Sequence, residues 1–234
     1  MLGGLQDLHL EHVITAIGGL GTGAFGLVDA AKSTFGGINR VGMDHIRKVV
    51  SDLTPEGAGA GKPTNALPQA DILLTLEANW VNGVDLVTQK AVAKSLVKLH
   101  LNAGNAAAVA ARASFDPLLL SKIAANVATG VPLSQTECDA YARFDEIVTA
   151  LLDEAYQLSD QVYRNFTRTL AAGVAVVLSV AGSWSLVGTD HFWNSSDPVL
   201  AILVGLLATP LAPIAKDLSS ALATAVSTTQ LVKQ

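Results

Sequence analysis

The sequence predicts an all-α integral membrane protein, and three observations support this fold class. The chain of 234 residues is 50% hydrophobic and only 15% charged, whereas a soluble domain usually carries about 25% charged residues. Apolar runs long enough to cross a bilayer as helices lie near both ends of the sequence. Between these runs, apolar residues recur at helical spacing, and no strand-type alternation of any length is present.

Composition and charge exclude several classes of protein. The 15 Lys and Arg residues against 20 Asp and Glu residues give a formal net charge of −5. We therefore expect no nucleic acid partner, because such a partner requires a basic face. A disordered chain would be more polar and more highly charged. The single cysteine, Cys138, excludes an intramolecular disulfide and any Cys-rich metal site.

Residues 1–31 form an N-terminal segment with a candidate transmembrane helix at residues 12–28, which would span about 25 Å. Glycines weaken a helix in water, but in a bilayer small residues let helices approach closely. Gly19 and Gly23 match the small-xxx-small pattern, so we expect them at a helix–helix contact. The alternative is a glycine-rich helix that lies on or inside the protein.

Residues 32–69 are expected to form a cytoplasmic connector that ends in a linker rich in Gly, Pro and Ala at residues 54–69. The segment GAGAGKPT within this linker partly resembles the motif of a phosphate-binding loop. That motif requires Gly where this chain has Glu56, and Ser or Thr where it has Pro63. We therefore expect no nucleotide site and no cofactor.

Residues 70–168 are expected to form a helical cytoplasmic domain. Its first part, from Asp71 to Ala113, has few residues that break a helix apart from Gly83 and Gly104. The pattern therefore predicts one long helical stretch across these positions.

Local signals mark the ends of the next helices. Asp116 before Pro117 is typical of a helix start, because Asp caps free amides and Pro is tolerated at the first helical position. We expect this helix to end near Gly130. Ser134 and Glu137 have the spacing of a capping box, which predicts the start of another helix.

The helix that begins at Gln135 is expected to continue as a long stalk into the membrane, as far as Val187 and over about 80 Å. It carries apolar residues at alternating spacings of four and three. We expect these residues at helix–helix contacts: Tyr141, Phe144, Val148, Leu151, Ala155, Leu158 and Val162. The stripe has two interpretations, namely packing against residues 71–113 of the same chain or self-association through a coiled coil.

Residues 169–215 are expected to form a transmembrane helical hairpin. Residues 169–187 and 198–215 contain no Lys, Arg, Asp or Glu, and each run is close to the length that a bilayer requires. Residues 188–197 form a short polar turn between them. The alternative is a buried helical hairpin of a soluble protein.

The residue types at the ends of these runs agree with two membrane spans. Asp197 before Pro198 is a helix-start signal. Pro210 and Pro213 weaken the second span, because each removes a backbone donor and favours a kink or an end. Interfacial aromatic residues are expected next to the turn. These membrane-interface anchors are Trp184, Phe192 and Trp193.

The distribution of positive charge predicts the orientation in the membrane. All Lys and Arg residues lie in residues 32–168 or 216–234, and positive residues stay on the cytoplasmic side. We therefore place residues 32–168 and the C-terminus in the cytoplasm, at the inner (plasma) membrane, with the 188–197 turn outside. Residues 216–234 would form a cytoplasmic or interfacial helix. The basic anchors next to the hairpin are Arg164, Arg168 and Lys216.

A search for catalytic and metal-binding patterns finds none that is specific. His9 and His12 lie three residues apart with Asp7 and Glu11 nearby, but a polar boundary before an apolar run explains them better than a metal site. Seven acidic residues between Glu137 and Asp160 are interpreted as a solvated helix face. We therefore expect no catalytic residues and no bound metal.

These observations together favour a non-enzymatic membrane anchor or scaffold, whose partners are the lipid bilayer and either further copies of itself or another protein. The main alternative is a pore-forming or membrane-disrupting effector, because a helical domain followed by a hydrophobic hairpin is similar in arrangement to colicin-like toxins. A membrane enzyme, a transporter subunit and a soluble helical protein also stay open. The spans lack internal charged residues, which argues against an active transporter.

Overall fold

The computed structural model describes residues 10–34, 37–56 and 67–232, and these residues contain helices and no strand. The prediction of an all-α fold is therefore confirmed for the described part of the chain. The helices are α1 (Leu10–Thr34), η1 (Ile38–Arg40), α2 (Met43–Leu53), α3 (Gln69–Val81), α4 (Leu86–His100), α5 (Ala106–Ala113), α6 (Pro117–Thr129), α7 (Gln135–Val187), α8 (Thr189–Phe192) and α9 (Asp197–Val232).

The chain divides into two compact units. The central unit comprises Gly36–Tyr163, and the terminal unit comprises Met1–Phe35 together with Arg164–Gln234. The expected connector at residues 32–69 therefore contributes most of its length to the central unit and is folded into it, although residues 57–66 of its linker lie outside the described residues.

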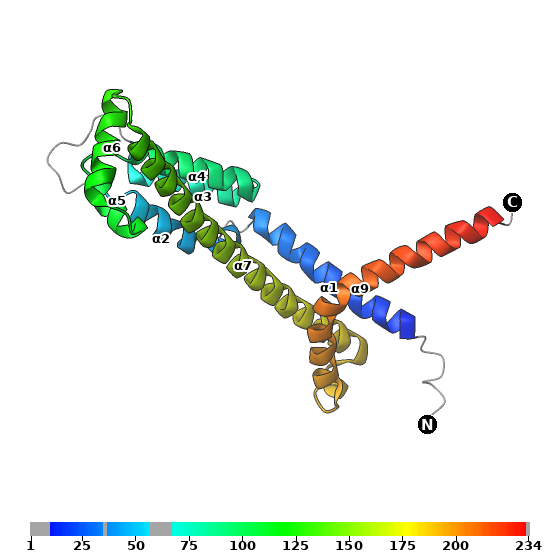
Figure 1. Ribbon diagram of the computed structural model, residues 1–234. Coiled ribbons are helices and arrows are strands. Elements are labelled where there is room, and N and C mark those ends of the chain that lie inside the picture. Colours follow the sequence, from blue (N-terminus) through cyan, green and yellow to red (C-terminus); the bar gives the residue numbers. More distant parts are fainter. Residues whose placement is uncertain (1–9, 35–36, 57–66, 233–234) are drawn as a thin grey trace. The chain divides into compact units, whose positions relative to one another are not determined.

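The central unit has a hydrophobic core to which helices α2 to α7 all contribute. Figure 1 shows α2 to α6 gathered along the first part of α7. The largest side chains in this core are fully buried and come from distant parts of the sequence. They include Met43, Ile46, Ile72, Leu76, Leu120, Phe144, Leu152 and Tyr156. The core therefore forms from this unit's own residues.

The predicted helix starts are confirmed by side-chain caps. The Asp116 carboxylate accepts hydrogen bonds from the amides of Leu118 and Leu119, at 2.9 and 3.2 Å, and Gly130 ends α6 in the left-handed region. At the start of α7, the Ser134 amide donates to Glu137 Oε2 at 2.8 Å, and the Glu137 amide donates to Ser134 Oγ at 3.4 Å. These reciprocal bonds are the predicted capping box.

The single helical stretch predicted from Asp71 to Ala113 is wrong, because the structure divides it into α3, α4 and α5. Gly83 takes a φ of +68° between α3 and α4, a conformation that glycine adopts at little cost. Between α4 and α5, the Asn102 amide donates to Asn105 Oδ1 at 2.8 Å, next to Gly104. Side chains that satisfy the backbone in this way compete with helical hydrogen bonds and end the helix.

Helix α2 lies in the segment that was expected to be only a connector. Its apolar residues follow helical spacing, and Met43, Ile46, Val50 and Leu53 are all buried in the core. That spacing is the signal that could have predicted this helix.

The terminal unit contains α1, the last part of α7, α8 and α9. Helix α7 runs without a break from Gln135 to Val187, as its uninterrupted pattern predicts. Helix α9 continues through Pro210 and Pro213 to Val232. Of the expected kink or end, the end is therefore not met, and the kink stays a prediction. Each proline removes one backbone donor, and helices in bilayers tolerate this loss where neighbouring groups compensate.

Candidate functional site

Among the described residues, three helices that lie wholly or partly in the terminal unit are long and apolar enough to cross a membrane. They are α1 over Val13–Lys32, α7 through its apolar part, and α9 over Asp197–Ala215. Large apolar side chains on these helices point outward, as shown by Leu186 at 88% exposed and Val177 at 67% exposed. Exposed apolar residues in such a density are typical of a surface that meets lipid or a partner.

Small residues occupy the contact between α1 and α9. A Cβ atom added at Gly18 would lie 2.0 Å from the Ala215 Cβ, and one added at Gly21 would lie 2.0 Å from the Ala208 carbonyl oxygen. The two backbones are therefore closer together than any side chain at these glycines would allow. Close backbone approach through small residues is the usual mode of helix packing in membranes.

Helix α7 joins this packing through a third glycine. A Cβ atom at Gly205 of α9 would lie 2.4 Å from the Cα of Val176 in α7. Ala24 of α1, Ala175 of α7 and Ala208 of α9 are fully buried in one cluster. The three candidate spans therefore make their closest contacts through Gly and Ala, while Ile17, Leu20 and Val174 pack partly buried beside this cluster and many other large side chains are exposed.

The predicted contact residues Gly19 and Gly23 lie on a different face of α1 from this packing. A Cβ atom at either position would meet nothing within 4 Å. Gly18 and Gly21, which were not among the predicted contact residues, make the intrachain contact instead. The glycine-rich segment has small residues on several faces of the helix, so its sequence alone does not show which face packs against another helix. Whether Gly19 and Gly23 meet another copy of the chain stays a prediction.

The three aromatic residues predicted as interface anchors come together around α8. The ring centroids of Trp184 and Trp193 lie 6.5 Å apart, and those of Phe192 and Trp193 lie 5.1 Å apart. Trp184 Nε1 donates a hydrogen bond to Thr189 Oγ1 at 3.3 Å. Both Trp side chains are exposed, whereas Phe192 is fully buried. Two of the three rings are therefore exposed and available to an interface, whereas Phe192 is buried and packs against Trp193.

The basic residues predicted near the membrane are described only in part. Arg164 and Arg168 are exposed on α7. The backbone at Lys216 is helical, but its side chain lies outside the described residues, as do those of most of residues 217–232. The interfacial position of the last segment therefore stays a prediction.

The apolar stripe on α7 packs within the central unit over its first half. Phe144 and Val148 are fully buried, and Tyr141 and Leu151 are half-buried against the same core. Leu158 and Val162, however, are each 39% exposed, and Leu152, Tyr156 and Ser159 are buried in their place. A straight helix has 3.6 residues per turn, so a heptad stripe drifts around it by about 20° per repeat. The buried residues of α7 therefore follow the repeat of 3.6 residues of a straight helix and not the heptad repeat of 3.5 residues.

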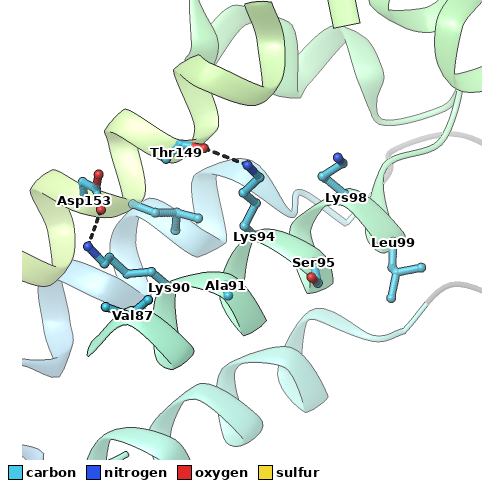
Figure 2. A pocket seen from close by; sticks show the side chains of 10 residues that line it. Val87, Lys90, Ala91, Lys94, Ser95, Lys98, Leu99, Thr149 and Asp153 are labelled. Carbon is cyan, nitrogen blue, oxygen red and sulfur yellow. Dashed lines mark hydrogen bonds and ion pairs between the residues drawn. The ribbon is translucent and has the colours of Figure 1, made fainter. Parts of the chain in front are cut away.

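A groove of about 680 Å³ lies between α4 and α7, and three lysines line it (Figure 2). Lys90 pairs with Asp153 at 2.7 Å, Lys94 donates to Thr149 at 3.1 Å and also pairs with Asp145, and Lys98 pairs with Asp145 at 2.9 Å. These pairs correct the interpretation of the acidic series as a merely solvated face. In the first turn of α7, Glu137 pairs with Lys122 of α6 at 2.9 Å.

The electrostatics of the groove follow from these ion pairs. Burial of Asp145 disfavours its charged form, but hydrogen bonds from Lys94 and Lys98 outweigh burial and lower its pKa. The hydrogen bond to Asp145 raises the pKa of Lys98, whose ammonium also lies 5.0 Å from the centre of the Tyr141 ring. Lys98 is thus stabilised in its charged form, and the ion pairs of the groove join α4 to α7.

Other residues considered for chemistry are dispersed. Cys138, His45 and His191 are exposed. His100 is buried, and its two ring nitrogens face the carbonyl oxygens of Leu67 and Pro55 at 2.9 and 3.3 Å. It thereby holds the two ends of the linker together. Within the described residues, no cluster of His, Cys, Asp and Glu has the arrangement of a metal site. His9 and the side chain of His12 lie outside the described residues.

Neither protein-family models, nor curated proteins, nor solved structures gave a match when they were compared with this chain.

Proposed function

We propose that this chain is an integral membrane protein that acts as a non-enzymatic anchor or scaffold for its helical central unit. The observation that carries this proposal is the arrangement of side chains in the terminal unit. Glycine and alanine make the closest contacts between α1, α7 and α9, with Ile17, Leu20 and Val174 packed partly buried beside them, whereas many of the other large apolar side chains are exposed. A helical unit in water would bury its large apolar side chains, and a lipid environment removes that requirement.

The central unit supports the second part of the proposal. It has a continuous core of its own, so it can be held at a membrane without taking part in the spans. Its exposed apolar residues include Leu74, Val87 and Leu118, and such residues are available for contacts with another protein or with another copy of the chain.

The proposed orientation places the central unit in the cytoplasm at the inner (plasma) membrane and the 188–197 turn outside. All described Arg and Lys side chains lie in or next to the central unit or at the end of α1, and the turn carries none. Under the positive-inside rule, Arg164 and Arg168 at the start of the apolar part of α7 hold this end on the cytoplasmic side.

Labelling with an impermeant maleimide tests both insertion and orientation. The native Cys138 is exposed in the central unit and reports the inner side. In a Cys138→Ser background, Ser196→Cys reports the turn, because Ser196 is exposed at the start of α9. We expect intact cells to label the Ser196→Cys protein, and only lysed cells to label the protein with native Cys138. Labelling of both, or of neither, in intact cells contradicts this topology.

Two further measurements separate an anchor from the alternatives. An anchor stays in the membrane fraction after carbonate washing and purifies in detergent as an oligomer or with a bound protein. A protein that carbonate releases would be peripheral or soluble, which would overturn the proposal. Leakage of a small dye from vesicles that contain the purified chain would instead favour the pore-forming alternative.

A further inference from the structure

The groove between α4 and α7 is lined by two rows of side chains from α4 (Figure 2). The charged row consists of Lys90, Lys94 and Lys98. The uncharged row has a large residue at each end and two small residues between them, namely Val87, Ala91, Ser95 and Leu99. Within each row the residues follow one another at intervals of four, so both rows run along the helix. The uncharged row extends over about 18 Å.

The uncharged row is open at the surface. Val87 is 74% exposed and Leu99 is 68% exposed, and Ala91 and Ser95 are exposed between them. Because the two middle residues are small, a trough remains between the two large ones, and ridges of side chains on another helix pack into such troughs. Exposed apolar side chains beside polar ones are typical of a surface that meets another protein.

The charged row carries more positive than negative charge. Its three ammonium groups pair with only two carboxylates, because Lys90 pairs with Asp153 while Lys94 and Lys98 share Asp145. Each lysine side chain remains about one-third exposed. An ammonium group has three donors, and partly exposed ion pairs are weak. The lysines can therefore contact a further anion, and the excess of one positive charge favours an acidic partner.

We propose that this groove binds an amphipathic helix of another protein, with acidic residues along one side and small or apolar residues beside them. Asp or Glu residues at intervals of four on such a helix match the spacing of the charged row. The apolar side of the helix packs into the trough between Val87 and Leu99, as amphipathic helices do in other grooves. This inference rests on the proposed scaffold function, for which it names the class of partner.

A second copy of this chain lacks the required helix. No described helix carries two Asp or Glu residues at a spacing of three or four. The formal net charge of −5 also means that the chain as a whole repels acidic peptides. Binding of an acidic helix would therefore be a local property of the groove and not the result of a general attraction.

Fluorescence anisotropy of a labelled peptide measures this binding to the purified full chain in detergent. The probe is a helical peptide of about 15 residues, with Glu at every fourth position and Leu and Ala in the neighbouring row. The matched probe has Gln in place of every Glu. We expect saturable binding of the Glu peptide and a dissociation constant about ten-fold higher for the Gln peptide. Equal affinity for the two peptides, or no saturable binding of the Glu peptide, would overturn the proposal.

Charge substitutions test the contribution of the lysine row. Lys90→Gln should weaken binding of the Glu peptide. Asp153→Asn should strengthen it, because the substitution removes the carboxylate that competes for Lys90. Glu154→Gln is the matched control, since it removes an exposed neighbouring carboxylate outside the groove, and should leave the affinity unchanged. Unchanged or weaker binding by a folded Asp153→Asn protein would contradict the proposed role of the charged row.

A steric substitution tests the position of the helix. Ser95→Leu fills the trough and should raise the dissociation constant of the Glu peptide about ten-fold. Ala111→Leu enlarges an exposed residue of α5 outside the groove and should have no effect. Equal affinity of these two variants would show that the peptide does not lie in the trough.

The failure of this inference is distinguishable from a failure of the proposed function. A chain that resists carbonate and shows the expected labelling, but does not distinguish the two peptides, refutes the groove and leaves the membrane anchor intact. A chain that carbonate releases, but that binds the Glu peptide through the groove, retains the docking site without the membrane role.

Discussion

Gly205 of α9 lies so close to Val176 of α7 that a Cβ atom at Gly205 would be 2.4 Å from the Val176 Cα and 2.8 Å from its amide nitrogen. Both of these are backbone atoms, which cannot relieve a clash by a change of rotamer as a flexible side chain can. The two apolar helices can therefore pack at this distance only if residue 205 has no side chain.

Gly205→Ala should weaken the packing of α7 on α9. We expect a loss of about 1–3 kcal/mol in the free energy of unfolding, the usual cost of overpacking, measured by SDS titration of the purified chain in mixed micelles. Gly182→Ala is the matched control, because a Cβ atom at this glycine of α7 meets nothing within 4 Å. Equal stability of the two variants would refute the close packing at Gly205.

The glycines of α1 should separate intrachain packing from self-association. Gly21→Leu places a side chain against the Ala208 carbonyl of α9 and should destabilise the chain in the same titration. Gly23→Leu meets open space within the chain, so it should leave unfolding unchanged. If the predicted contact of Gly19 and Gly23 is made between copies, Gly23→Leu should lower the oligomeric mass in detergent. A loss of unfolding stability from Gly23→Leu would argue against this assignment of faces.

Gly42 should be intolerant of any side chain, for two reasons. Its φ is +91°, and a Cβ atom there would lie 2.4 Å from the Ser159 carbonyl oxygen. Gly42→Ala should therefore destabilise the central unit by about 1–3 kcal/mol, measured by thermal unfolding with near-ultraviolet circular dichroism. Gly37→Ala, at a φ of −65° and with open space around it, should unfold close to the original temperature. Similar losses from both substitutions would contradict the contact between Gly42 and Ser159.

Glu137 should make the chain sensitive to acid. The hydrogen bond from the Ser134 amide, helped by Lys122, lowers the pKa of Glu137 from 4.5 to about 2. This residue lies far before the apolar part of α7 at residues 169–187. Because its pKa is lower in the folded state, its contribution to stability is complete above about pH 4.5 and is lost as the pH falls towards 2.

Glu137→Gln should flatten the decline in unfolding temperature between pH 4.5 and pH 2 and lower the stability at pH 7. Glu146→Gln, which removes an exposed carboxylate from the same helix, should keep the decline of the original chain. The measurement is thermal unfolding of the two variants and the original chain across this range. An unchanged slope in Glu137→Gln would mean that the capping box does not account for the acid sensitivity.

Asp145 should join α4 to α7 through Lys94 and Lys98. Asp145→Ala is expected to cost about 1 kcal/mol, because these ion pairs are partly exposed and solvent screens them. Combining it with Lys98→Ala in a double-mutant cycle should give a smaller loss than the sum of the single losses. Glu146→Ala provides the neighbouring control. Strict additivity of Asp145→Ala and Lys98→Ala would show that this pair does not contribute to stability.

The sequence by itself predicted features that depend on neighbouring residues. Asp116, Pro117 and Gly130 bracket α6 because capping and the left-handed conformation are local properties of the backbone. The capping box at Ser134 starts α7, and the absence of Pro and Gly allows that helix to continue into its apolar part. The length and apolarity of three helices also follow directly from composition.

Only the tertiary structure decided which face of each helix makes contact. Gly18 and Gly21 pack on α9, whereas Gly19 and Gly23 do not, although all four are glycines. Lys98 and Asp145 pair across 47 positions of the sequence, so no local pattern could match them. A cap requires atoms within one turn of chain, but a packing face is selected by backbones that meet only after folding.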